Sequence, residues 1–148
     1  MTSKYKILFL CTGNSCRSQM AEAWTRELKG DQFESYSAGV EPKSIDPRAV
    51  KAMAEVGIDI SAQTSKDIEA LGKQEFDYVA TLCDHANEAC PFFPGKTRRI
   101  HRAFDDPPKL AAGIAAEEAA MAFYRRVRDE IRAFVEKFPI SLAEPDND

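Results

Sequence analysis

The residues best placed to do chemistry form one short segment, residues 11–18, with the sequence Cys-Thr-Gly-Asn-Ser-Cys-Arg-Ser. An apolar run at 7–10 precedes this segment, and a helix-prone stretch follows it from 19 onward. A strand, a tight turn and a helix start would direct several backbone N–H groups and the positive helix end into one small space. Such a space favours an anion, and a thiolate at Cys11 is one. Arg17 adds a planar guanidinium that can grip two oxygens of a tetrahedral oxyanion.

The segment therefore predicts a nucleophile and an oxyanion-binding loop in one place. We expect Cys11 to be the nucleophile rather than a buried core thiol, because it directly follows a strand and lies in a glycine-containing turn. Cys16 in the same loop is expected to be structural, with its side chain directed away from the anion. The predicted substrate-binding residues are those of the loop after its nucleophile: Thr12, Gly13, Asn14, Ser15, Cys16, Arg17 and Ser18.

A second candidate group is the acidic pair that opens the sequence Asp-Asp-Pro-Pro at 105–108. This run could be no more than a turn, because Asp and Pro are common turn residues. However, a thiolate that attacks a tetrahedral oxyanion needs a group that protonates the departing oxygen. We predict Asp106, beside the proline, as this general acid in preference to Asp105.

Two later cysteines, Cys83 and Cys90, are separated by six residues. They could be solvent-facing thiols or metal ligands, but zinc favours short paired spacings that this chain lacks. If the segment between them is helical, it spans about 10 Å of helix axis, whereas a disulfide requires Cα atoms about 4.4–6.8 Å apart. A disulfide between them would require the segment to unwind, which predicts a redox-coupled switch. His85 and His101 are expected to make local polar contacts rather than to bind metal.

The elements that must position these groups alternate along the chain. Apolar and β-branched runs predict strands at 5–10, 33–38, 76–82 and 97–102, and helical patterns occur at 18–29, 47–56, 64–71 and 111–138. This alternation predicts an α/β fold, one three-layer flavodoxin-like domain with a four-stranded parallel sheet and helices on both faces. We assign residues 1–139 to this domain and 140–148 to an acidic, disordered tail. Cys11, Gly39, Cys83 and Asp106 each follow a strand or lie just beyond one, so they should converge at the carboxyl edge of the sheet.

Bulk properties narrow the function further. The 148-residue chain carries 24 acidic and 20 basic residues, a net charge of −4 that argues against nucleic-acid binding. No apolar stretch approaches the ~20 residues of a membrane span, and the N-terminal apolar run is too short for a signal peptide. We therefore expect a cytoplasmic monomer whose four cysteines are thiols rather than a structural disulfide framework.

Taken together, these motifs resemble the low-molecular-weight tyrosine phosphatase superfamily, and more closely its thioredoxin-dependent arsenate reductase branch. The nucleophile loop continues with Gln-Met-Ala-Glu, where the phosphatases typically have Ser-Pro-Met-Ala-Glu. The resemblance extends over nearly the whole chain, to about residue 138, and Pro108-Lys109 stands where the phosphatases have a tyrosine pair. The further matching motifs are Thr81-Leu82-Cys83, Cys90-Pro91, and His101 with Phe104-Asp105-Asp106-Pro107.

The resemblance implies a reaction with three cysteines and no tightly bound cofactor. Cys11 would attack arsenate held by Arg17 and the loop amides, with Asp106 protonating the leaving oxygen. Cys83 would then attack the Cys11–arsenic adduct, releasing arsenite and leaving a Cys11–Cys83 disulfide. Cys90 would attack Cys83, and thioredoxin would reduce the resulting Cys83–Cys90 disulfide.

Some relatives bind potassium beside the nucleophile loop, through residues that match Asn14, Glu22 and Ser37 together with an aspartate. Lys66 stands at the aspartate position here, and we expect its ammonium to replace the ion and pair with Glu22. The neighbouring Asp67 leaves ion binding open as an alternative.

Two other functions are compatible with the loop. A phosphotyrosine phosphatase would use Cys11, Arg17 and an aspartate but would leave Cys83 and Cys90 without a role. A non-catalytic oxyanion-binding or redox-sensing module would keep the loop without turnover.

Overall fold

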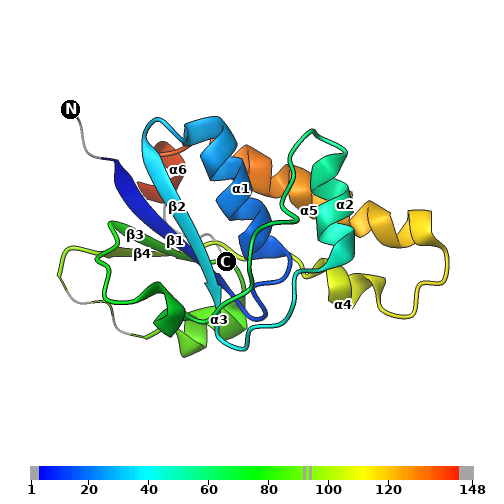
Figure 1. The fold of residues 1–148 in the computed structure, drawn as a ribbon, viewed down its shortest axis with the longest axis horizontal. Coiled ribbons are helices and arrows are strands. Elements are labelled where there is room, and N and C mark those ends of the chain that lie inside the picture. Colours follow the sequence, from blue (N-terminus) through cyan, green and yellow to red (C-terminus); the bar gives the residue numbers. More distant parts are fainter. Residues whose placement is uncertain (1–3, 92, 94, 144–148) are drawn as a thin grey trace.

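Four parallel strands form the centre of the molecule in the computed structural model, which describes residues 4–91, 93 and 95–143. The sheet order is β2-β1-β3-β4 (Figure 1). Leu10 of β1 pairs with Ala38 of β2 and with Thr81 of β3, so β1 has a neighbour on each side. This explains why its apolar run is fully buried. The strands are β1 (Tyr5–Cys11), β2 (Phe33–Gly39), β3 (Tyr78–Thr81) and β4 (Arg98–His101).

The helices cover the two faces unequally. Right-handed crossovers place α1 (Arg17–Lys29) and α3 (Asp84–Ala89) on opposite faces of the sheet. The long helix α5 (Glu117–Glu136) packs against α1, and α2 (Pro47–Ala54) lies against α5 (Figure 1). The α/β prediction with a four-stranded parallel sheet is therefore confirmed. The remaining elements are the 3₁₀ helix η1 (Ile68–Leu71), α4 (Pro107–Ala111) and α6 (Ile140–Ala143).

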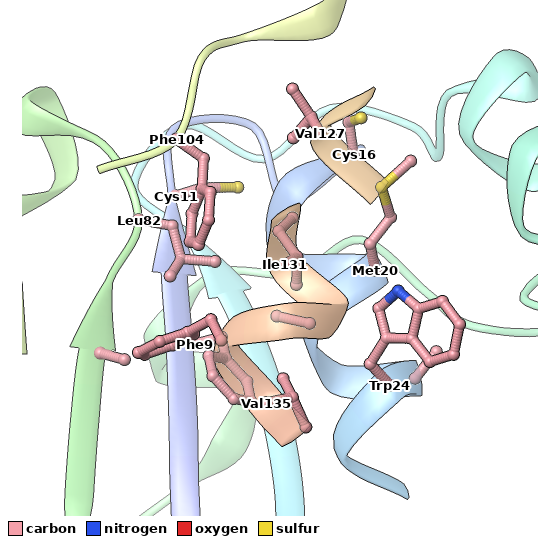
Figure 2. Packing of buried hydrophobic residues seen from close by; sticks show 14 of the residues in the cluster. Phe9, Cys11, Cys16, Met20, Trp24, Leu82, Phe104, Val127, Ile131 and Val135 are labelled. Atoms are coloured by element: carbon pink, nitrogen blue, oxygen red, sulfur yellow. The ribbon is translucent and has the colours of Figure 1, made fainter. Parts of the chain in front are cut away.

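The main core lies between the sheet and the pair α1 and α5. Phe9 of β1, Trp24 of α1 and Ile131 of α5 are all buried in this layer (Figure 2). The Trp24 indole N–H donates to the carbonyl of Arg128, so its one polar atom is satisfied. Apolar residues recur at three- and four-residue steps along α5 and just beyond it, and each of them is buried: Ala120, Tyr124, Val127, Ile131, Phe134 and Phe138.

Three predicted boundaries are wrong. The helix expected at 111–138 is divided, because Gly113 adopts a φ of 81° and ends the turn after α4 before α5 begins at Glu117. The helix expected at 64–71 is only η1, Ile68–Leu71. The tail expected from 140 is ordered at first, because Ile140–Ala143 form α6 with Leu142 buried. Residues 144–148 of that tail lie outside the described residues.

No helix among the described residues is both long and apolar enough to cross a membrane.

Candidate active site

The nucleophile loop, residues 11–18, connects the carboxyl end of β1 to α1, as predicted. Every backbone carbonyl from residue 11 to residue 16 accepts a hydrogen bond from a group outside the loop's concave side. The C=O and N–H of a peptide point in opposite directions. Because these carbonyls point outward, the N–H groups point toward the concave side. The donors to these six carbonyls are, in order, the amides of Val40, Glu41 and Lys43, the Gln19 side chain, and the amides of Asp46 and Met20.

The concave side of the loop is a cavity of about 130 Å³. In the part of the chain that the structure describes, the amides of residues 13–17 have no protein acceptor, so they are available to an anion. Preorganised N–H groups of this kind bind and stabilise oxyanions. The loop therefore has the geometry expected of the oxyanion site that the sequence predicts. The cavity is lined by Cys11, Thr12, Gly13, Ser15, Cys16, Arg17, Lys43, Asp106 and Pro108.

Cys11 lies at the base of this cavity and is 2% exposed. Its Sγ is 2.9 Å from the Ser18 Oγ, which itself accepts a 2.7 Å hydrogen bond from the Asn14 side chain. Because the Asn14 side-chain amide donates to that hydroxyl, the hydroxyl can still give its own hydrogen to the sulfur. Such a donor stabilises negative charge on a nucleophilic sulfur.

Asn14 has a backbone role as well. It adopts a φ of 49°, in the left-handed region that asparagine tolerates better than most residues. Gly39, where β2 ends, allows this tight turn: a Cβ there would lie 2.8 Å from the Asn14 amide nitrogen. Both residues therefore serve the sharp curvature that creates the cavity.

Arg17 and Asp106 face each other across the mouth of the site. The Arg17 Nη1 donates to the Phe104 carbonyl at 3.0 Å, which fixes the guanidinium, and its Nη2 lies 3.6 Å from the Asp106 Oδ2. Asp105 instead pairs with Arg126 on the surface at 2.9 Å. Only Asp106 of the acidic pair lines the cavity, which favours it over Asp105 as the proton donor.

Cys83 is adjacent to the nucleophile loop, as the strand order requires. Its Sγ lies 3.3 Å from the Thr12 Oγ1 and accepts a hydrogen bond from the Ala86 amide at the start of α3. Cys83, Arg17 and Asp106 also line a second cavity, of about 360 Å³. The two cavities thus share Arg17 and Asp106, and Cys83 reaches the substrate site from its side.

Cys90 ends the same helix on its far side and is only partly buried. The segment between the two cysteines is helical, as assumed for the switch. All four cysteines are free thiols. Burial raises the pKa of the Cys90 thiol. The pKa of Cys16, 2% exposed and part of the hydrophobic core, is raised well above its ordinary value by burial and by the nearby Asp46 carboxylate.

The two histidines make local polar contacts, as predicted. His101 bridges the Thr81 hydroxyl, at 2.8 Å, and the Asp84 carboxylate, at 2.9 Å. His85 lies 4.0 Å from the Glu41 carboxylate. Among the described residues, no group of three or more potential metal ligands converges.

The expected pairing of Lys66 with Glu22 is wrong. The Lys66 ammonium donates to the Thr64 carbonyl, because the local turn brings that oxygen to 2.8 Å. The Glu22 carboxylate accepts from the Ser37 hydroxyl at 2.6 Å and lies 3.7 Å from Arg26.

These groups fit a potassium ion poorly. The Asn14 Oδ1 already accepts from the Lys66 amide, and the Glu22 oxygens are engaged by a hydroxyl and a guanidinium. The Asp67 carboxylate caps η1 through the Ala70 amide. Potassium is bound through several oxygen ligands at once, and these oxygens are already engaged.

Sequence reasoning missed the segment that follows β2. Residues 40–46 lie along the nucleophile loop, and the exposed Lys43 joins the cavity lining. Asp46 caps α2 through the Arg48 amide. An Asp before Pro-Arg-Ala-Val does predict a helix cap, but no local pattern shows that this cap touches the loop.

Comparison with known proteins gives consistent matches. A family model described as low molecular weight phosphotyrosine protein phosphatase matches residues 6–146. An arsenate reductase from Halalkalibacterium halodurans is 52% identical over 136 residues, covering 92% of this chain and 96% of that protein. An arsenate reductase from Bacillus subtilis is 51% identical over 132 residues, with coverages of 89% and 93%.

Solved structures that resemble this chain also include arsenate reductases. An arsenate reductase in an oxidized state matches with a TM-score of 0.73 at 30% identity, over 93% of this chain and 98% of that one. Another, in a phosphate binding state, matches with a TM-score of 0.66 at 31% identity, over 89% and 94%.

Proposed function

The chain belongs to the low molecular weight phosphotyrosine protein phosphatase family, and within that family we propose that it reduces arsenate to arsenite. The relatives named arsenate reductase, at about half identity over almost the full length, support this choice. The observation that carries it is the placement of Cys83, whose sulfur lies beside Thr12 of the oxyanion loop. A phosphatase has no use for a second thiol there.

The first step is attack on bound arsenate. The Cys11 thiolate forms a sulfur–arsenic bond while Arg17 and the loop amides hold the remaining oxygens. Asp106 supplies a proton to the departing oxygen, which leaves as water after a second proton from solvent. The arsenic is still in its +5 state in this adduct.

Reduction occurs in the second step. The Cys83 thiolate attacks the Cys11 sulfur, so a disulfide forms and the sulfur–arsenic bond breaks. The bonding electron pair stays with arsenic, which leaves as arsenite in its +3 state. Two thiols have then lost two electrons, and arsenic has gained them.

The final steps restore the nucleophile. Cys90 attacks the Cys83 sulfur, a Cys83–Cys90 disulfide forms, and the Cys11 thiolate is released. A disulfide at the partly exposed end of α3 is open to a dithiol protein, and we propose thioredoxin as that reductant. The partial exposure of Cys90 supports this step, because Cys11 itself is buried and out of reach of another protein.

The experiment couples the protein to thioredoxin, thioredoxin reductase and NADPH, and follows arsenate-dependent NADPH consumption. Wild type should cycle, whereas Cys83→Ser and Cys90→Ser should lose multiple turnover. Both variants should keep weak hydrolysis of a small aryl phosphate, because Cys11, Arg17 and Asp106 remain. That retained activity shows that the loop is intact.

Full arsenate cycling by Cys90→Ser would refute the three-cysteine relay. Aryl phosphate hydrolysis that far exceeds arsenate reduction in wild type would favour the phosphatase function instead. Added potassium should change arsenate turnover little, because the groups beside the loop are already engaged. A strong rise with potassium would overturn that last point.

A further inference from the structure

A strap of backbone, residues 40–46, runs along the outside of the nucleophile loop. Four of its amides donate to loop carbonyls: Val40 to Cys11, Glu41 to Thr12, Lys43 to Gly13 and Asp46 to Ser15, at 2.8–3.2 Å. The two segments are distant in sequence, and no residue of the strap takes part in the proposed chemical steps. It is nevertheless the main source of donors for the loop's outward carbonyls.

These bonds have a direct effect on the oxyanion site. A carbonyl that is held outward keeps the peptide from rotating and presenting oxygen to the cavity. The strap therefore keeps acceptor atoms out of a site where an anion must bind. Preorganised donors of this kind lose little free energy to reorganisation when the anion arrives.

The far end of the strap is locked by Asp46. Its Oδ2 accepts a 2.5 Å hydrogen bond from the Tyr124 hydroxyl, and its Oδ1 accepts from the Arg48 amide. Tyr124 belongs to α5 and is 2% exposed, so its position is fixed by the core. One residue thus connects the loop carbonyl of Ser15 to the rigid packing of α5.

We propose that Asp46 and Tyr124 are positioning residues that hold the strap, and through it the oxyanion-binding amides, in the conformation that binds the substrate. The proposal deepens the proposed function, since it concerns the same cavity. It requires only that the cavity binds a tetrahedral oxyanion, so it can be tested without any reduction step.

The protonation state of Tyr124 supports a hydrogen bond to Asp46 that persists over a wide pH range. Burial, together with the hydrogen bond to Asp46, raises the pKa of Tyr124 above its ordinary value. The phenol therefore stays protonated and remains a donor at neutral and alkaline pH. A phenylalanine would fill the same core space, so the hydroxyl is the part of the side chain that this lock uses.

The test measures the dissociation constant of inorganic phosphate for the reduced protein by calorimetry. Tyr124→Phe removes only the hydroxyl, and we expect phosphate binding to weaken by about three- to tenfold. The matched control is Val135→Ala, a fully buried position further along the same helix. It should lower resistance to denaturant at least as much and leave phosphate affinity unchanged.

A second pair of variants distinguishes the positioning of the strap from an effect on the stability of the whole protein. Asp46→Asn keeps an acceptor for the cap and a polar partner for the phenol, so it should restore most of the affinity that Asp46→Ala loses. Wild-type affinity in Tyr124→Phe would overturn the proposal. An equal loss of affinity in Val135→Ala would also overturn it, because it would show an effect of global stability. If phosphate binding responds to the variants as expected but wild type does not reduce arsenate, the proposed function is wrong and the positioning role of Asp46 and Tyr124 is still supported.

Discussion

The molecule holds its four cysteines in two pairs, and the two regions are built in opposite ways. Cys11 and Cys16 are each 2% exposed, and they lie in a loop whose carbonyls from residue 11 to residue 16 all accept hydrogen bonds. Cys83 and Cys90 lie at the two ends of a six-residue helix, α3, and the second is partly exposed. The first region must keep one shape to bind an anion. In the proposed relay, the second must change shape to bring its sulfurs together.

Helix length explains why the second region can change. An isolated helix of six residues is far below the length that is stable in water, so α3 depends on its neighbours. One such contact is the bond between the Thr81 hydroxyl and Asn87, and Arg99 also donates to Asn87. A few partly exposed hydrogen bonds of this kind each stabilise the helix only modestly. The nucleophile loop is therefore held by many backbone hydrogen bonds, whereas α3, which would unwind in the proposed relay, is held by few contacts.

The largest expected effect distinguishes the two cysteines of the rigid loop. Cys11→Ser should lower both arsenate reduction and aryl phosphate hydrolysis by at least about a thousandfold, because the nucleophile is lost. Cys16→Ala should cost about 1 kcal/mol of stability and lower either activity by less than about threefold. Steady-state kinetics and denaturant unfolding measure both.

The reason for this difference lies in the environment of Cys16. Burial and Asp46 keep its pKa high, so it stays a neutral thiol in the core. If Cys16→Ala abolished turnover without unfolding the protein, Cys16 would have a chemical role rather than a structural one.

A smaller effect concerns pH and the pair Cys83 and Cys90. Burial raises the pKa of Cys90, so its thiolate is a minor species near neutral pH. Below that pKa the thiolate fraction, and with it the rate of attack on Cys83, should rise about tenfold per pH unit. Rapid-quench measurement of Cys83–Cys90 disulfide formation tests this between about pH 6 and pH 8. A rate that is flat over this range would mean that a step other than Cys90 ionisation controls the relay.

The smallest effect tests the unwinding itself. Ala89→Gly at the exposed end of α3 weakens the helix by about 0.5–1 kcal/mol. Formation of the Cys83–Cys90 disulfide should then accelerate by about two- to fivefold if unwinding precedes it. Ala122→Gly, on the exposed face of α5, is the matched control and should leave this rate unchanged. Equal acceleration in both variants would indicate general loosening of the fold.

Much of the fold and of the candidate site could be predicted from local sequence patterns. The buried run before Cys11 predicts a central parallel strand, and the positions of Cys11, Cys83 and Asp106 after their strands predict their convergence. The preference for Asp106 follows from its proline neighbour and agrees with the observed partner of Asp105, the surface residue Arg126.

The missed features depend on tertiary contacts. The strap at 40–46 has no periodic pattern, and its donors are backbone amides that every residue except proline possesses. Tyr124 has the spacing of a core residue, so its hydroxyl bond to Asp46 is invisible in sequence. The Lys66 interpretation failed because a two-residue turn brings the Thr64 carbonyl within reach of the ammonium. Similarly, Gly113 ends a helical pattern through one positive φ.

The central claim is that electrons pass from Cys11 and Cys83 to arsenic and that Cys90 then completes the relay. It is tested most directly by mixing the reduced protein with arsenate in the absence of any external reductant, quenching in acid, and mapping disulfides by mass spectrometry. Wild type should release about one arsenite per chain and carry a Cys83–Cys90 disulfide. Cys90→Ser should release the same amount and stop at a Cys11–Cys83 disulfide. Stoichiometric arsenite release by Cys83→Ser, or a Cys11–Cys16 disulfide in Cys90→Ser, would contradict the relay.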